Sequence, residues 1–384
     1  MTRRSFVVVR NLPWPPRSGG DLRYLHVVGA LADLGPTFVY GLSGGGAPPR
    51  PDLAGWRRSS VPESARVLDA DGISAAVKAR RSPFALELHP ETITELRALV
   101  EEFAPDQVLV GGFELFGALD ALRPSVERLV LDLDFVRGVA FEEMGAADPH
   151  RRRGVLWRAL APLVGDDERK AVAQADEAWV CAAADVERVR DLAPATPVVV
   201  VPNVVDVAYY PAAGGPPDAL VFPARFDYWP NEVAAGTLVH DVLPALPAAT
   251  LALVGAAPPA WLRDLADPRV DVTGAVPDVR VHLAAAGAMP LPITAGGGTR
   301  LKALEAFAAR LPVVATAKAV EGLDLVAGTH YLEAMSTDDF VAALAALRDD
   351  RALVDRLVGQ AHDLVEEHYS LAALHAAVDT TCAS

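Results

Sequence analysis

The feature that most constrains this chain is an alternation of short valine- and leucine-rich runs with longer stretches rich in alanine, leucine, glutamate and arginine. Such alternation is typical of strand-helix-strand units, which build parallel sheets. We therefore predict an α/β protein with two Rossmann-like, doubly wound domains. The expected strands of the first half lie at residues 6–9, 37–40, 107–110, 129–131, 177–180 and 198–201, and those of the second half at 219–223, 250–254, 270–273, 288–291 and 313–315.

The boundary between the two halves is expected at a segment rich in proline and glycine, residues 202–217. Such segments commonly link domains, and 384 residues are too many for one ordinary core. We predict an N-terminal, acceptor-side domain over residues 1–205 and a C-terminal, nucleotide-sugar-binding domain over residues 206–365. A last segment, residues 366–384, is expected to form a helix that can cross back to the N-terminal domain.

Charge and composition exclude several classes of protein. The protein has a net charge of −15 and an isoelectric point near 5.0, so it would repel a polyanion, which argues against nucleic-acid binding.

No apolar run approaches the roughly 20 residues that span a bilayer, and the run at residues 6–9 is too short for a signal peptide. A cytoplasmic location with at most weak membrane association is expected. The two cysteines, Cys181 and Cys382, provide neither a disulfide framework nor a metal-binding cluster.

The strongest local signal is a glycine-rich loop between an expected strand and a helix that is expected to begin near Thr299. Its three consecutive glycines are Gly296, Gly297 and Gly298. Exposed amides and the positive end of a helix dipole together bind anions, and two cations, Arg300 and Lys302, add charge that suits two linked phosphates. A plain flexible turn with solvated charges is the alternative. The loop fits neither a Walker A motif nor a G-x-G-x-x-G motif.

Glu305 lies further along the same expected helix. Its carboxylate could accept hydrogen bonds from both ribose hydroxyls of a nucleotide whose phosphates lie at the helix start. A surface pair with Lys302, three residues earlier, is an equal alternative.

A second glycine turn, with Gly19 and Gly20, follows the first expected strand. Ligands of open α/β sheets bind outside the carboxyl ends of the strands, so this turn can contact a ligand. A connector with a helix cap is the alternative. We predict acceptor contacts for three nearby residues, Arg17, Arg23 and His26.

Two carboxylates, Asp132 and Asp134, come at the end of a strongly apolar strand. Carboxylates at such a place are costly unless they are paired or solvated in a cleft. We predict a functional role for Asp134, whereas capping of the next segment is the better interpretation of Asp132.

Taken in order, these motifs resemble those of the family 4 retaining glycosyltransferases of GT-B fold, in the subgroup with a G-G-G-T-R-x-K loop. Residues 15–23 are similar to the family's N-terminal P-x-x-G-G-x-x-R turn, and residues 201–206 to its V-P-N-G-V-D hinge segment. Residues 222–231 resemble its G-R stretch, and residues 296–305 its donor loop. Each motif alone is weak, but the ordered set covers nearly the whole chain.

The resemblance implies two domains that face each other across a cleft and a nucleotide-diphosphate sugar as co-substrate, with neither a further cofactor nor a metal. It implies transfer of the sugar to the hydroxyl of a small-molecule or glycan acceptor, with retention, in carbohydrate or natural-product biosynthesis. Cationic side chains and a helix start would take the leaving-group charge. The donor contacts would be Gly19, Gly20, Val276, Gly297, Gly298, Thr299, Arg300 and Glu305.

Individual roles also follow from the resemblance. Arg225 and Lys302 would hold the diphosphate, Glu305 the ribose and the backbone at Val276 the base. The catalytic set would then be Asp134, Arg225 and Lys302, with Asp134 near the acceptor.

Two departures from the family pattern matter for the mechanism. The glutamate usually found eight positions before Glu305 is here Gly297, and the usual lysine after Arg225 is replaced by the pair Pro230-Asn231. We hypothesise that Lys302, alone or with Arg300, supplies the missing cation from the opposite loop. The absent glutamate leaves open a second hypothesis, a catalytically inert GT-B protein that binds sugar nucleotides or acts as a scaffold.

Overall fold

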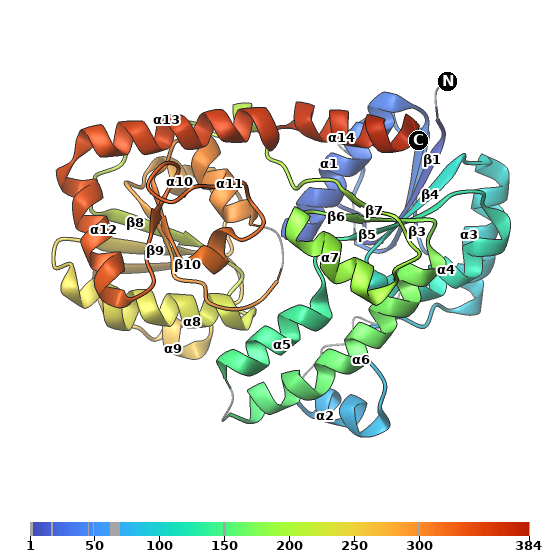
Figure 1. Cartoon of the computed structure of the whole chain (residues 1–384), viewed down its shortest axis with the longest axis horizontal. Coiled ribbons are helices and arrows are strands. Elements are labelled where there is room, and N and C mark those ends of the chain that lie inside the picture. The colour runs from blue at the N-terminus through green and yellow to red at the C-terminus, as the bar shows by residue number, and fades with distance from the viewer. Residues whose placement is uncertain are drawn as a thin grey trace. The chain divides into compact units, whose positions relative to one another are not determined.

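A computed structural model describes residues 3–16, 18–44, 46–48, 50–61, 70–148, 151–297 and 300–383 of the chain. The chain divides into two compact units (Figure 1). Unit 1 comprises Met1–Asn203, Gly296–Thr299 and Leu374–Ser384, and unit 2 comprises Val204–Ala295 and Arg300–Ala373.

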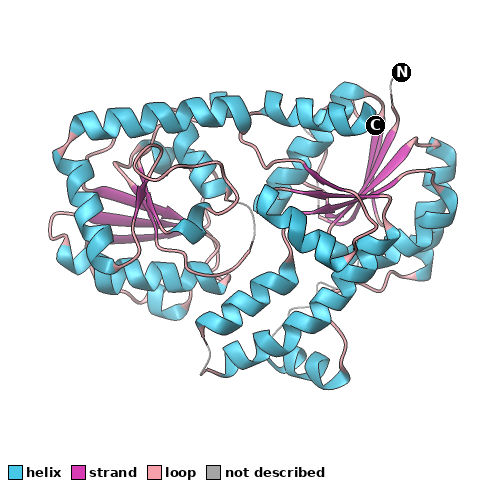
Figure 2. Ribbon diagram, viewed as in Figure 1, coloured by secondary structure: helices cyan, strands magenta, loops and turns pink. Residues whose placement is uncertain are grey.

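Unit 1 is built on one parallel sheet with strand order β3-β2-β1-β4-β5-β6-β7. Its central strands are buried on both faces, as their continuous apolar sequences predict. Parallel neighbours need crossover connections, and Figure 2 shows helices on both sides of the sheet. The strands are β1 Ser5–Asn11, β2 Thr37–Ser43, β3 Gly55–Arg58, β4 Gln107–Gly111, β5 Leu129–Leu133, β6 Glu177–Val180 and β7 Val198–Val200.

The first helix of unit 1 follows β1. Helix α1 starts at the early glycine turn, where the Ser18 hydroxyl accepts a hydrogen bond of 3.2 Å from the amide of Asp21. This N-cap satisfies one of the amides that a helix start leaves without an internal partner. The helices are α1 Gly19–Leu34, α2 Ala70–Ala79, α3 Pro90–Phe103, α4 Phe116–Leu122, α5 Arg137–Ala147, α6 Arg152–Gln174 and α7 Ala183–Leu192, with 3₁₀ turns η1 Phe113–Leu115 and η2 Arg123–Ser125.

Helix α14 (Leu371–Ala383) belongs to unit 1 from Leu374 onward. The Arg128 side chain, from the residue just before β5, donates a hydrogen bond of 2.6 Å to the carbonyl oxygen of Thr381. Near the other end of this part of the helix, His375 Nε2 lies 2.9 Å from an oxygen of Asp33 in α1. Residues from both ends of the sequence therefore complete the same unit.

Unit 2 has two three-stranded parallel sheets, with orders β10-β9-β8 and β11-β12-β13. A parallel bridge from Leu220 to Ala288 joins them, so that the strand order becomes β10-β9-β8-β11-β12-β13. This is the doubly wound order of unit 1, and the prediction of two Rossmann-like domains is confirmed. The strands are β8 Ala219–Pro223, β9 Thr250–Val254, β10 Val270–Gly274, β11 Met289–Leu291, β12 Val313–Ala315 and β13 Leu332–Glu333.

The helices of unit 2 include two long ones near its end, α12 and α13. Ser336 and Asp339 form a capping box at the start of α12, in which each side chain accepts a hydrogen bond from the other's backbone amide. The helices are α8 Trp229–Thr237, α9 Ala260–Arg263, α10 Arg280–Ala284, α11 Leu301–Ala308, α12 Thr337–Asp349 and α13 Arg351–His368, with shorter turns η3 Val207–Tyr209, η4 Leu238–Val242, η5 Leu243–Ala245 and η6 Ala317–Val320.

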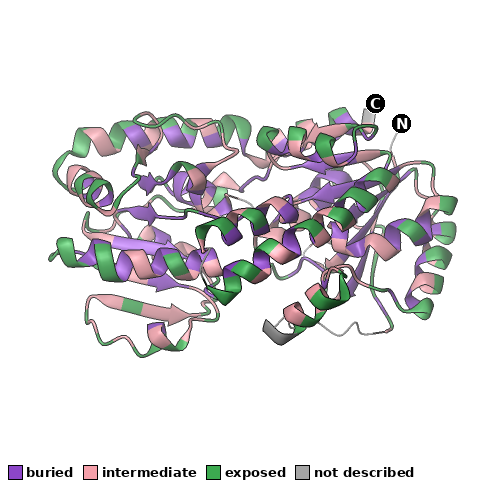
Figure 3. Cartoon of the chain, turned by 60° about the horizontal axis from the view of Figure 1, so that its bottom comes forward, coloured by how far each residue is buried: buried purple, intermediate pink, exposed green. Residues whose placement is uncertain are grey.

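Two edge strands, β3 and β13, were absent from the sequence prediction. Strand β3 carries Arg57 and Arg58, both exposed, and charged residues at a sheet edge hide the usual apolar signal. Strand β13 has only two residues, too few for a periodic pattern. Figure 3 shows buried residues mainly in the inner strands of the sheets, whereas the edge strand β10 and the outer helix faces lack them.

None of the described helices combines the length and the apolar character needed to cross a bilayer. The cytoplasmic location stays a prediction.

Candidate active site

The predicted donor loop leads into α11, which begins at Leu301 with Arg300 in the N-cap position. Gly298 and Thr299, two of the predicted donor contacts, lie outside the described residues. Within unit 1, a Cβ atom added to Gly297 would lie 2.5 Å from Cδ2 of Phe135. A glutamate at this position, as the resemblance leads one to expect, would require Phe135 to move.

Lys302 lies in the first turn of α11, and its ammonium group has two neighbours within unit 2. It donates a hydrogen bond of 2.8 Å to Oδ1 of Asn231 in α8, and it lies 4.9 Å from the centroid of the Phe222 ring. Burial lowers the pKa of Lys302 to about 7; the negative charge of Glu305 opposes this shift, and the positive charge of Arg300 adds to it.

Asn231 also contacts the second predicted diphosphate ligand, Arg225. Its side-chain nitrogen donates a hydrogen bond of 2.8 Å to the carbonyl oxygen of Arg225. The guanidinium group of Arg225 is itself exposed and pairs with the carboxylate of Asp227. One buried amide side chain therefore links Lys302 to the loop that carries Arg225.

Glu305 does not form the alternative pair with Lys302, because each of the two bonds a different partner. The hydroxyl of Tyr210 donates a hydrogen bond of 2.9 Å to Oε1 of Glu305. Burial raises the pKa of Glu305, whereas the Tyr210 hydrogen bond and the Lys302 charge oppose that shift. Val276, the predicted contact of the base, is half-buried in the loop after β10.

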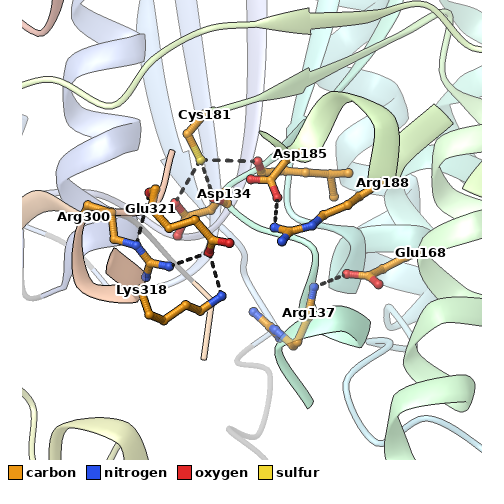
Figure 4. Close-up of polar contacts among 10 residues, drawn as sticks. Asp134, Arg137, Glu168, Cys181, Asp185, Arg188, Arg300, Lys318 and Glu321 are labelled. Carbon is orange, nitrogen blue, oxygen red and sulfur yellow. Dashed lines mark hydrogen bonds and ion pairs between the residues drawn. The ribbon is translucent and has the colours of Figure 1, made fainter. Parts of the chain in front are cut away.

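Arg300 was predicted to contact the diphosphate, and its side chain is engaged elsewhere in unit 2. Nη2 of Arg300 lies 3.0 Å from a carboxylate oxygen of Glu321, and Lys318 Nζ lies 2.6 Å from the same oxygen (Figure 4). A phosphate group would have to compete with this carboxylate for Arg300. Of the two loop cations, Lys302 therefore has the geometry that better fits the predicted role.

In unit 1, Asp134 follows β5 and lies beside the early glycine turn. A Cβ atom added to Gly20 would be 3.6 Å from Oδ2 of Asp134, an ordinary contact distance, so the start of α1 lies close to this carboxylate. Asp134 is half-buried, and burial raises its pKa to about 6, with Asp132 adding to the shift while Arg23 and Arg137 oppose it. The thiol of Cys181 contacts the Asp134 carbonyl oxygen (Figure 4).

Arg23 and Asp132 form a buried ion pair. The sequence had predicted an acceptor contact for Arg23 and helix capping for Asp132. Nε of Arg23 lies 2.7 Å from Oδ2 of Asp132, its Nη2 contacts Oδ1, and the two side chains are 1% and 0% exposed. Nη1 of Arg23 donates to the Val201 carbonyl oxygen and to Oδ1 of Asn203, each at 2.9 Å. The acceptor contact predicted for Arg23 is corrected to an internal contact that joins α1, β5 and residues 201–203, and Asp132 does not act as a helix cap.

The other N-terminal predictions are placed as follows. Gly19 is the first residue of α1, His26 is half-buried in its second turn, and Arg17 lies outside the described residues. Their ligand contacts stay predictions.

Glu168 and Arg137 form a polar contact in unit 1 that the sequence did not reveal (Figure 4). The fully buried carboxylate of Glu168 accepts hydrogen bonds from the amides of Arg137 and Gly138, at 2.6 and 3.0 Å, and so caps α5 from the middle of α6. Burial raises the pKa of Glu168 to about 7, against the effect of these hydrogen bonds. The Arg137 guanidinium lies 5.1 to 5.2 Å from the ring centroids of Phe84, Phe113 and Phe135.

Comparison with known proteins gives a family match in the C-terminal half. Residues 217–350 match the model of the family described as glycosyl transferases group 1, and this span holds Arg225, Asn231, Lys302 and Glu305. No curated protein matches the chain.

Several solved structures are similar over nearly the whole chain. A sucrose-phosphate synthase from Thermosynechococcus elongatus has a TM-score of 0.76 at 16% identity, over 99% of this chain and 98% of that chain. Anabaena HepE in complex with UDP and glucose has a TM-score of 0.68 at 14% identity, over 100% of both chains. A Rickettsia africae glycosyltransferase has a TM-score of 0.63 at 11% identity, over 98% of this chain and 97% of that chain.

At these identities the similarity establishes the fold alone, while the family match concerns the activity. Membership of family 4, retention and the donor role of the loop stay predictions. The prediction of a glycosyltransferase is confirmed: the chain has the GT-B fold and carries a group 1 glycosyltransferase domain at residues 217–350.

Proposed function

We propose that the protein transfers a glycosyl group from a nucleotide-diphosphate sugar to an acceptor hydroxyl, with retention and without a metal ion. In this reaction the bond between the anomeric carbon and the diphosphate oxygen breaks. A bond between that carbon and the acceptor oxygen forms, and the hydroxyl proton passes to the departing diphosphate. Negative charge grows on the departing diphosphate, so cations placed in advance would lower the barrier.

The observation that carries the proposal is the shared contact of Asn231 with Lys302 and with the Arg225 backbone, at 2.8 Å in each case. All three residues lie in the span that matches the group 1 glycosyltransferases. In our proposal Lys302 and Arg225 bind the diphosphate. Asn231 occupies the region where related sequences have a lysine, and its side chain holds the ammonium group of Lys302, which α11 provides.

The remaining donor contacts would come from Glu305 at the ribose and from the backbone near Val276 at the base. Gly19 and Gly20 would approach the sugar-phosphate, and Asp134 would accept a hydrogen bond from the acceptor hydroxyl. Anabaena HepE, similar in fold, is in complex with UDP and glucose, which supports a nucleotide-diphosphate sugar as the class of donor here.

The test is release of nucleoside diphosphate during incubation with a panel of nucleotide-diphosphate sugars and acceptor alcohols, with and without a metal chelator. We expect release that the chelator does not reduce and that Lys302→Ala lowers at least tenfold, as loss of one leaving-group contact would. Lys170→Ala is the matched control, because Lys170 is an exposed lysine paired only weakly, at 3.6 Å, with Asp167.

Two outcomes would change the proposal. Thermal stabilisation by a sugar nucleotide without any release would favour the inert binding protein. Proton NMR of the new linkage checks retention of the anomeric configuration. An inverted product would contradict retention but not glycosyl transfer itself.

A further inference from the structure

A pair of adjacent tyrosines, Tyr209 and Tyr210, connects two parts of unit 2 that are far apart in sequence. They lie at the end of η3, shortly after unit 2 begins. The Tyr210 hydroxyl lies 2.9 Å from Oε1 of Glu305 in α11. The two rings meet edge to face, with centroids 6.0 Å apart and planes at 85°.

Tyr209 anchors the same segment to the loop between β10 and α10. Nη1 of Arg280 donates a hydrogen bond of 2.9 Å to the Tyr209 carbonyl oxygen, and the guanidinium carbon lies 3.3 Å from the centroid of the Tyr209 ring. Arg280 is held in turn by the carboxylate of Asp278, at 2.7 and 2.8 Å. Because the Tyr209 backbone is fixed in this way, the neighbouring Tyr210 approaches Glu305 from a defined direction.

We infer that Tyr210 is a positioning residue for the nucleotide ribose, which acts by holding the carboxylate of Glu305. This inference rests on the proposed function, in which Glu305 binds the ribose. An ionised carboxylate has about four acceptor sites, so the single bond from Tyr210 leaves enough for two adjacent ribose hydroxyls. It also removes the rotational freedom that Glu305 would otherwise lose on binding.

The charge of Glu305 supports the same role. Burial disfavours the ionised carboxylate, and the phenol hydrogen bond favours it. Tyr210 thus keeps Glu305 in the form that accepts hydrogen bonds from hydroxyl groups.

The experiment compares Tyr210→Phe with the wild type by calorimetry. The probes are UDP, GDP and ADP and their 2′,3′-dideoxy counterparts, which lack the hydroxyls that Glu305 would bind. We expect Tyr210→Phe to weaken the ribonucleotide that the wild type binds by roughly tenfold, the loss typical of one hydrogen bond to a charged group. Binding of the dideoxy counterpart should stay within about twofold of the wild-type value, and the acid limb of ribonucleotide binding should move to higher pH in the variant.

Tyr331→Phe is the matched control, because it removes another tyrosine hydroxyl of unit 2 that bonds a glutamate, Glu333, at 3.3 Å. Equal losses for both probes would show a merely structural role for Tyr210 and overturn the inference, as would no loss for either. If the wild type binds neither these six nucleotides nor CDP and dTDP, the proposed function fails, and the inference that rests on it fails too. This result is distinguishable from a failure of the inference alone, because it is seen with the wild-type protein and does not depend on Tyr210→Phe.

Discussion

Oδ1 of Asn231 accepts a hydrogen bond of 2.8 Å from Nζ of Lys302 across 71 residues of sequence. In the function that we propose, this ammonium group replaces the one that related sequences carry shortly after the position of Arg225. An amide at position 231 can hold an ammonium group, whereas a second lysine at that position would repel it.

Replacement of Asn231 by alanine should weaken binding of a nucleoside diphosphate by about tenfold. A hydrogen bond to a charged group contributes about 1.5 kcal/mol at the lower end of measured values, which corresponds to that factor. Calorimetry with the nucleotide that the wild type binds checks this. Gln360→Ala, which removes an exposed amide from α13, should leave the affinity unchanged; equal affinity of the Asn231 variant would contradict the role.

Binding of a nucleoside diphosphate should take up a proton at pH 8. The pKa of Lys302 is about 7 before the ligand binds, so at pH 8 only roughly a tenth of the molecules carry the ammonium charge. The bound diphosphate favours the charged form and raises this pKa, so a proton enters with the ligand. Titrations in two buffers with different ionisation enthalpies measure the uptake, which should disappear at pH 6 and in Lys302→Met. Uptake that persists in this variant would assign the proton to another group.

The rate of transfer should fall on the acid side with a midpoint near pH 6, the pKa of Asp134. Both oxygens of the ionised carboxylate can accept a hydrogen bond from the acceptor hydroxyl. In the protonated form one of these oxygens carries a proton and becomes a donor. In Asp134→Asn the rate should be at least tenfold lower and should lack this acid limb. A pH profile of initial rates decides the point, and an unchanged limb in the variant would exclude Asp134 as its origin.

The Arg23–Asp132 pair should be needed for the stability of unit 1. Asp132→Ala leaves a buried guanidinium without its carboxylate, a change that typically costs about 3 to 5 kcal/mol of unfolding free energy. The double variant Arg23→Met, Asp132→Leu should recover much of that loss, because an apolar pair of similar volume needs no counter-charge. Urea titrations of the three proteins measure the difference. A single variant as stable as the wild type would contradict the buried pair.

Glu168 should make the stability of unit 1 depend on pH. Its pKa in the folded protein is about 7, above the usual value for glutamate, so the folded state binds more protons than the unfolded state between about pH 4 and 7. The free energy of unfolding should therefore decrease as pH rises through this window and level off above it. In Glu168→Gln that decrease should be smaller. Urea midpoints at pH 5 and pH 8 check it, with the exposed Glu187→Gln as control.

The secondary-structure elements that were predicted correctly depend on patterns in their own stretch of sequence. Strands β8, β9 and β12 were predicted with their observed bounds because each is a compact apolar run between breaks. Lys302 and Glu305 were predicted to lie on one helix because they are close in sequence, and their placement needs no information from the rest of the fold.

The contacts that could not be predicted depend on tertiary structure. Asp132 lies within β5 and pairs with Arg23, 109 residues away, and nothing in the local sequence indicates that pair. Glu168 lies in the middle of α6, and nothing in its neighbours indicates that it caps another helix 30 residues earlier. The Tyr210–Glu305 contact spans 95 residues and has no local signal either.

The attachment of α14 has a consequence for biosynthesis. Within unit 1, Thr381 accepts a hydrogen bond from Arg128, which lies just before β5 and is translated much earlier. Domains generally begin to fold in order as they leave the ribosome. Residues 1–203 therefore emerge before Thr381 and His375 can contact Arg128 and Asp33, so this part of unit 1 lacks its C-terminal helix until the residues after Ala373 have been translated.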